Sequence, residues 1–221
     1  MKERFDAIFF DNDGILVDTE PLFLQATKEI LATVGVDLST EVYHDLTMRQ
    51  GRTVFEMVSA KGISDEQILE MRAVREVRYA DLIRGGISVL DGVKETVAAL
   101  EGVRRTAIVT SSGRMHFELI HEQTGLLPYF EFVLADGDYT HHKPHPEPYE
   151  LAAERMGVDP ARFLVIEDTE RGLTSATEAG MACVVIPNEL TEGADFPGAL
   201  ARLDSMHELG PLLGIEVRSV I

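Results

Sequence analysis

Five short apolar runs, at residues 5–10, 105–110, 130–135, 162–167 and 182–187, constrain the fold of this chain most strongly. The runs are densely apolar rather than alternating, as expected of strands that are covered on both faces. After the second run, stretches of helical period separate each run from the next, and strands that alternate with helices form a parallel sheet. We therefore predict an α/β fold with a Rossmann-like, three-layer core.

The interval between the first two runs contains no convincing strand and reads as helical. It holds helical patterns at 20–35 and 64–86, and Ser64 and Gln67 form a capping-box pattern at the start of the second. A crossover this long exceeds what one βαβ connection needs. We predict an inserted all-helical cap domain at residues 16–84, and an α/β core formed by residues 1–15 and 85–221.

The composition narrows the class of partner. Twenty Lys and Arg residues against 38 Asp and Glu residues give a formal net charge of −18, which disfavours binding to nucleic-acid backbones or anionic membranes. The single cysteine, Cys183, excludes an internal disulfide, and no apolar stretch reaches the roughly 18 residues needed to cross a bilayer. We expect a cytoplasmic protein, monomeric by default, with no nucleic-acid or membrane partner.

Polar residues follow the apolar runs, where a parallel sheet binds its ligands. They are Asp11, Asp13, Ser111, Ser112, Lys143, Glu167 and Asp168. Asp11 and Asp13 precede Gly14, where the chain can turn and bring both carboxylates to one ion, with Asp168 on its opposite side. A few carboxylates with room for water suit Mg²⁺ better than calcium or zinc. Carboxylates also act as nucleophiles in phosphoryl transfer, in which lysine and hydroxyl groups spread the developing charge.

Four segments carry a family resemblance: DNDGILVDTE, VTSS, KPHPEPY and VIEDTERGLTSATEAGM. In this order and spacing they resemble the motifs of the haloacid dehalogenase superfamily, specifically its phosphatases and β-phosphoglucomutase-like members with a helical cap. The resemblance spans nearly the whole chain.

The resemblance implies that Asp11 attacks phosphorus and forms an aspartyl-phosphate. Asp13 would protonate the leaving oxygen and then activate water. It further implies that Mg²⁺ is held by the Asp11 carboxylate, the Asp13 backbone carbonyl and Asp168, with Glu167 as a direct ligand or a support to one.

By the same resemblance, Ser111 and Lys143 hold the phosphate, and Ser112 assists through its backbone. In the cap, Arg49 and Arg52 lie in a stretch, TMRQGRT, that resembles the family's specificity loop. They could pair with an anionic group of the substrate, and the alternative is a solvated helix start.

Two further features leave alternatives open. His141, His142 and His145 match no dedicated zinc pattern, so we interpret them as a wet loop near the active site. Asn12 stands where the family usually carries an apolar residue, and Ile15 where threonine is common. We expect the Asn12 side chain to point away from the two aspartates and to alter packing or hydrogen bonding.

These observations predict a Mg²⁺-dependent phosphatase that hydrolyses a small phosphate ester, such as a sugar phosphate. A phosphomutase of the β-phosphoglucomutase type is the first alternative, although Phe23 stands where that enzyme's motif carries a histidine. Asp13 argues against a dehalogenase. A catalytically silent binding protein on the same fold is the remote alternative.

Overall fold

The structure is a computed structural model that describes residues 4–49, 52–189 and 191–217. The chain divides into two compact units, one formed by Met1–Asp18 with Ser88–Ile221 and the other by Thr19–Ile87. The divisions fall three residues later than the boundaries predicted from the sequence. Asp18 N–H donates to the Ser88 carbonyl at 3.0 Å and Val17 pairs with Val89, so both connecting segments are tied into the α/β unit.

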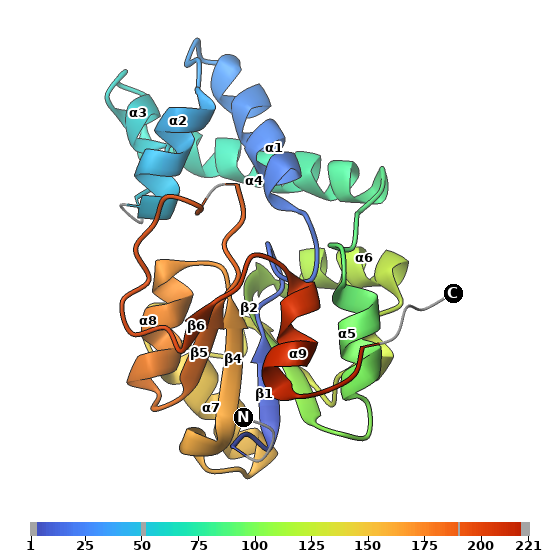
Figure 1. The fold of residues 1–221 in the computed structure, drawn as a ribbon. Coiled ribbons are helices and arrows are strands. Elements are labelled where there is room, and N and C mark those ends of the chain that lie inside the picture. The colour runs from blue at the N-terminus through green and yellow to red at the C-terminus, as the bar shows by residue number, and fades with distance from the viewer. Residues whose placement is uncertain (1–3, 50–51, 190, 218–221) are drawn as a thin grey trace. The chain divides into compact units, whose positions relative to one another are not determined.

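Among the described residues of the α/β unit, six strands form a parallel sheet in the order β3-β2-β1-β4-β5-β6 (Figure 1). Their bounds are β1 Ala7–Phe10, β2 Arg105–Gly113, β3 Val133–Asp136, β4 Phe163–Glu167, β5 Ala182–Val185 and β6 Ala201–Arg202. This is a doubly wound order, which confirms the predicted fold class. The two-residue β6 was not predicted, because it is too short to form an apolar run.

Helices cover both faces of this sheet (Figure 1). They are α5 Val93–Leu100, α6 Arg114–Thr124, α7 Glu147–Met156, α8 Glu170–Glu178 and the short α9 Leu209–Leu213, with 3₁₀ turns at Leu127–Tyr129, Pro160–Arg162 and Met206–Glu208. Phe9 of β1 packs with Phe163 of β4 and Tyr149 of α7, at ring-centroid distances of 4.4 and 6.2 Å. All four residues of β1 are buried, because β1 pairs with β2 and β4 at its two edges and helices cover both faces of the sheet.

The regular elements in the described part of the second unit are all helices. The unit contains α1 Glu20–Ala32, α2 Thr40–Tyr43, the π-helical segment η1 His44–Arg49, α3 Glu56–Ser59 and α4 Asp65–Arg84. Its own core includes Leu31, Tyr43 and Phe55. The capping box of Ser64 and Gln67 forms as predicted, whereas α2 and η1 lie in a polar stretch without a helical apolar pattern. None of the described helices combines the length and apolar character that a membrane span requires.

Candidate active site

Asp11 lies directly after the central strand β1. Its N–H donates to the Ile166 carbonyl at 3.0 Å and so continues the pairing with β4, and its side chain is buried. The chain then turns at Gly14, which has a φ of +80°. A Cβ at this position would lie 2.4 Å from Asp168 Oδ2, so both the backbone conformation and the closeness of Asp168 require glycine.

Lys143 connects the residue that follows β1 with residues of β2 and β4. Its buried ammonium donates to Asp11 Oδ1 at 2.7 Å, to Glu167 Oε1 at 2.6 Å and to the Val109 carbonyl at 2.9 Å. All three of its protons are therefore used. Burial alone would lower the pKa of Lys143, but the Asp11 and Glu167 carboxylates outweigh burial and raise it, so the ammonium stays charged.

Glu167 holds Lys143 rather than facing an open site. Its Oε1 also accepts from the Tyr149 hydroxyl at 2.8 Å, while Oε2 accepts from the Asp168 N–H and the Thr169 hydroxyl, each at 3.2 Å. Both oxygens of this buried carboxylate are thus engaged within the protein. Burial, followed by the charge of Glu167, raises the pKa of Tyr149, which keeps its hydroxyl protonated and able to donate.

Asp13 lies partly exposed beside the end of β2. Its Oδ2 accepts from the Ser112 hydroxyl and, at 3.3 Å, from the Thr110 hydroxyl. The Ser112 N–H in turn donates to Thr110 Oγ1 at 3.0 Å, so the side chain of Ser112 orients Asp13 while its N–H is used locally. The neighbouring Ser111 is exposed at the end of the same strand.

The acidic side chains offer a site that suits a divalent cation. Carboxylate oxygens of Asp11, Glu167 and Asp168 lie within 4.8 Å of one another, and all three residues are buried. The Asn188 side-chain amide donates to Asp168 Oδ2 at 2.8 Å and fixes the orientation of that carboxylate. An all-oxygen donor set of this charge fits Mg²⁺, which prefers carboxylate and water ligands.

The electrostatics of Asp11 agree with a role for a cation. Burial raises the pKa of Asp11 to about 7, with Glu167 and Asp13 adding to the rise and Lys143 opposing it. A cation beside this carboxylate favours its ionised form and would reverse the shift.

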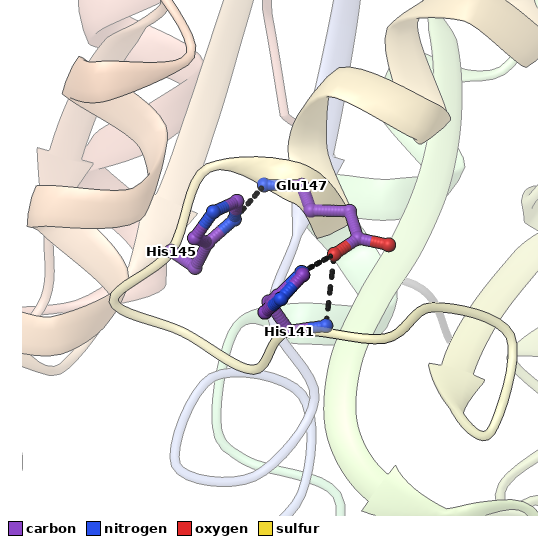
Figure 2. Close-up of side chains that lie close together, drawn as sticks. All are labelled: His141, His145 and Glu147. Carbon is purple, nitrogen blue, oxygen red and sulfur yellow. Dashed lines mark hydrogen bonds and ion pairs between the residues drawn. The ribbon is translucent and has the colours of Figure 1, made fainter.

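Glu147 organises the loop that carries Lys143 (Figure 2). Its carboxylate accepts from the Thr140 N–H at 2.9 Å, from the His141 N–H at 2.8 Å and from His141 Nδ1 at 2.5 Å, while its own N–H donates to His145 Nδ1 at 3.1 Å. The two imidazole rings stack with centroids 4.5 Å apart. The Thr140 N–H and then His141 lower the pKa of Glu147 to about 2, so its carboxylate is ionised at neutral pH.

The three loop residues also offer possible metal ligands within 4.8 Å of one another, but their geometry explains them without an ion. His145 Nδ1 accepts a hydrogen bond from the Glu147 backbone N–H, so in the neutral ring Nε2 carries the hydrogen and has no lone pair for a metal. His141 Nδ1 is bound to the Glu147 carboxylate. His141 and His145 therefore help to shape the loop, and Glu147, at the start of α7, was not predicted from the sequence.

The predicted cap arginines are only partly described. The side chain of Arg49 lies outside the described part of the chain, whereas Arg52 is exposed and ion-paired with Glu56 one helical turn further on. Asn188, also missed, follows the fifth apolar run directly and lies three positions beyond the end of β5. It could have been found by applying the same strand-end rule to that run.

A model of the haloacid dehalogenase-like hydrolases matches residues 8–186. The chain belongs to this family, and the predicted resemblance is confirmed. Its phosphatase relatives place it among the phosphoric monoester hydrolases of the family.

Particular relatives cover most of the chain. Protein CbbY of Rhodobacter capsulatus is 32% identical over 212 residues, which cover 90% of this chain and 93% of that protein. The fructose-1-phosphate phosphatase YqaB of Escherichia coli K12 is 32% identical over 188 residues, which cover 83% of this chain and 97% of that protein. A crystal structure of a CbbY mutant from Rhodobacter sphaeroides in complex with xylulose-(1,5)-bisphosphate superposes with a TM-score of 0.80 at 28% identity, covering 93% of this chain and 96% of that one.

Proposed function

We propose that this protein is a Mg²⁺-dependent phosphatase that acts through an aspartyl-phosphate on Asp11. The observation that carries the proposal is the position of Asp11 at the end of β1, with Lys143 Nζ 2.7 Å from one carboxylate oxygen and Asp168 among the neighbouring carboxylates. Mg²⁺ would be held by Asp11, Asp168 and the backbone carbonyl of Asp13, and would neutralise charge on the phosphoryl oxygens.

Asp11 and Asp13 would carry out the reaction in two chemical steps. In the first, an Asp11 carboxylate oxygen forms a bond to phosphorus while the bond from phosphorus to the ester oxygen breaks, and Asp13 donates its proton to that leaving oxygen. In the second, Asp13 takes a proton from water, the resulting oxygen bonds to phosphorus, and the Asp11 carboxylate leaves with release of inorganic phosphate. The hydroxyls of Ser112 and Thr110, both bonded to Asp13 Oδ2, keep that side chain in place for both transfers.

Lys143 and Ser111 are the proposed phosphate-binding groups. Lys143 carries a permanent positive charge at the floor of the site, and Ser111 exposes a hydroxyl at the end of β2. Ser112 is the supporting member, and its hydroxyl is used by Asp13. For Arg49 and Arg52 we keep the proposal that they recognise an anionic group of the substrate.

We propose a small sugar phosphate, or a similar metabolite, as the substrate class. The support comes from the relatives, one named for fructose 1-phosphate and one crystallised with xylulose-(1,5)-bisphosphate. A phosphomutase reaction is less well supported. Phe23, at the position where the mutase motif has histidine, has no group that can exchange a proton and stacks under the Arg75 guanidinium at 4.5 Å.

Phosphate release tests the proposal directly. The wild type, Asp11→Asn and the control Asp6→Asn are assayed with fructose 1-phosphate, xylulose 1,5-bisphosphate and β-glucose 1-phosphate, in Mg²⁺ and in EDTA. Asp6 is an exposed aspartate before β1, paired with Arg162, so its variant reproduces the substitution away from the site. We expect Mg²⁺-dependent release by the wild type and Asp6→Asn alone. Glucose 6-phosphate formed without free phosphate would establish the mutase instead, and release by Asp11→Asn would refute the assignment of the nucleophile.

The cytoplasmic location and the monomeric state remain proposals from the sequence. Cell fractionation tests the first. Sedimentation of the purified protein at several concentrations tests the second, and a mass that rises with concentration would contradict it.

A further inference from the structure

A chain of buried hydrogen bonds connects α6 to the segment between the two aspartates. The Leu126 N–H donates to Thr124 Oγ1 at 3.2 Å, Thr124 Oγ1 lies 2.9 Å from His121 Nδ1, and His121 Nε2 lies 2.8 Å from Asn12 Oδ1. Asn12 is fully buried, and His121 and Thr124 are each 4% exposed. The chain is thus closed to solvent along its length.

The donors and acceptors in this series of hydrogen bonds can be assigned from the chemistry of the groups. Because Thr124 Oγ1 accepts from a backbone N–H, its own proton is available for His121 Nδ1, and the neutral imidazole then carries its hydrogen on Nε2 and donates to Asn12 Oδ1. Burial lowers the pKa of His121 to about 4, with Asp13 opposing the shift, so the ring is neutral at neutral pH. The His121–Asn12 contact is therefore a hydrogen bond between two neutral groups at neutral pH.

Asn12 is also the residue around which the catalytic turn is built. Its carbonyl accepts from the N–H groups of Ile15, Leu16 and Val17 at 3.3, 2.8 and 3.2 Å. The backbone torsions of Asn12 set the relative positions of the Asp11 and Asp13 carboxylates. These torsions are restrained by the hydrogen bonds to the Asn12 carbonyl and by the hydrogen bond from His121 to the Asn12 side chain. The two restraints act on the one residue that lies between the nucleophile and the proposed acid.

The side-chain amide of Asn12 lowers the stability of the folded protein in a way that an apolar side chain would not. Its Nδ2 is buried and has no hydrogen-bond partner within the part of the chain that the structure describes. A buried donor left unsatisfied is unfavourable, whereas replacing both members of a buried hydrogen bond by apolar groups can be nearly neutral. Stability alone therefore does not explain a polar pair at this position.

We propose that His121 is a positioning residue for the phosphatase reaction, which acts through Asn12 to fix the backbone between Asp11 and Asp13. The inference rests on the proposed function. A displacement of reacting groups by about 1 Å can lower a rate about a hundredfold, so a residue that restrains this turn acts on kcat. Substrate affinity depends on other groups, chiefly Lys143 and Ser111, and KM is expected to change little.

The test separates positioning from packing by using a pair of apolar replacements. His121→Phe keeps the aromatic contact with Phe117, whose ring centroid lies 4.3 Å away, and Asn12→Leu removes the acceptor. Each single variant removes at least one hydrogen-bond partner from a buried polar group, so both should melt at lower temperature and turn over more slowly. The double variant Asn12→Leu/His121→Phe should recover most of the melting temperature, yet its kcat should stay at least about tenfold below the wild type, with KM within about threefold.

Thr96→Val is the matched control. Thr96 is buried on α5 and donates to the Met206 carbonyl at 3.3 Å, so its variant loses a buried hydrogen bond away from the aspartates. Its melting temperature should fall while kcat stays at the wild-type value. A double variant with wild-type kcat would overturn the proposal and reduce the pair to packing.

Amide hydrogen exchange supplies a readout that needs no turnover. The N–H groups of Leu16 and Val17, which donate to the Asn12 carbonyl, should exchange at least several-fold faster in the double variant than in the wild type or Thr96→Val. Unchanged exchange would overturn the restraint itself. If the wild type hydrolyses no phosphate ester, the proposed function fails, and with it the catalytic role of the His121–Asn12 hydrogen bond. The exchange rates would still show whether His121 restrains the turn.

Discussion

Gly172→Ala should damage the site although Gly172 carries no chemistry of its own. Gly172 lies on α8 against the carboxylate of Glu167, and a Cβ at this position would lie 1.9 Å from Glu167 Cδ and 2.0 Å from Oε2. Carbon atoms in contact are about 3.5–4.0 Å apart, so the carboxylate or the helix must move by roughly 1.5 Å or more. A shift of that size breaks the 2.6 Å bond from Lys143 and the 2.8 Å bond from Tyr149.

The magnitude follows from the burial of these groups. Glu167 and Lys143 are almost completely buried, and disrupting one partner of a buried ion pair is unfavourable by about 3–5 kcal/mol. We expect urea unfolding without Mg²⁺ to show a loss of this order, and kcat to fall at least about tenfold because Lys143 no longer holds its position beside Asp11.

Gly113→Ala is the matched control for this prediction. Gly113 has a φ of −61°, and its Cβ would meet nothing within 4 Å, so the same substitution should leave stability and activity nearly unchanged. A Gly172→Ala protein with an unfolding free energy within about 1 kcal/mol of the wild type and a wild-type kcat would contradict this prediction, because α8 and Glu167 would then accommodate the added Cβ without disturbing Lys143.

Three other expectations concern charge and metal. Asp11→Asn should abolish turnover. Burial raises the folded-state pKa of Asp11 to about 7, so the stabilising contribution of this carboxyl in EDTA is complete below about pH 4 and is lost as the pH rises through 7; melting temperatures of Asp11→Asn over this range should lack that loss. Burial lowers the pKa of His121 to about 4, so protonation of this histidine should lower the unfolding free energy of the wild type by up to roughly 3 kcal/mol as the pH falls from 6.5 towards 4. Urea unfolding of His121→Phe over the same pH range should lack this decrease. Mg²⁺ at about a hundred times its Kd should raise the unfolding free energy by about 2.7 kcal/mol, and thermal unfolding of Asp168→Asn, which loses a charged ligand, should show little of that gain; an equal gain in the variant would contradict the proposed ligand set.

The fold was predictable because strands covered on both faces must be apolar along their whole length. The runs at 5–10 and 162–167 therefore identified β1 and β4, whose residues are fully buried. The same logic could not find β6, which has two residues, or η1, which lies in a polar stretch. The predicted end of β2 was also three residues short, because Ser111 and Ser112 are polar but still belong to the strand.

Some residues of the candidate site could be predicted from the sequence and others could not. Asp11, Asp13, Lys143 and Asp168 could be named from the sequence, because each stands in a recognisable motif at or near the end of an apolar run. The sequence by itself therefore determined the fold class, the family and the identity of the residues available for chemistry. These depend on local composition and spacing, which a linear chain displays directly.

The role of each of these residues depends on contacts that form only in the folded protein. Lys143 reaches Asp11 across 132 positions of sequence, and His121 reaches Asn12 across 109. That Glu167 holds Lys143, that Glu147 organises its loop and that Asn12 is bonded to α6 all depend on the register of neighbouring strands and on the packing of helices over them. Contacts between distant positions arise when the chain closes around its core, and no local pattern encodes which buried polar group will meet which.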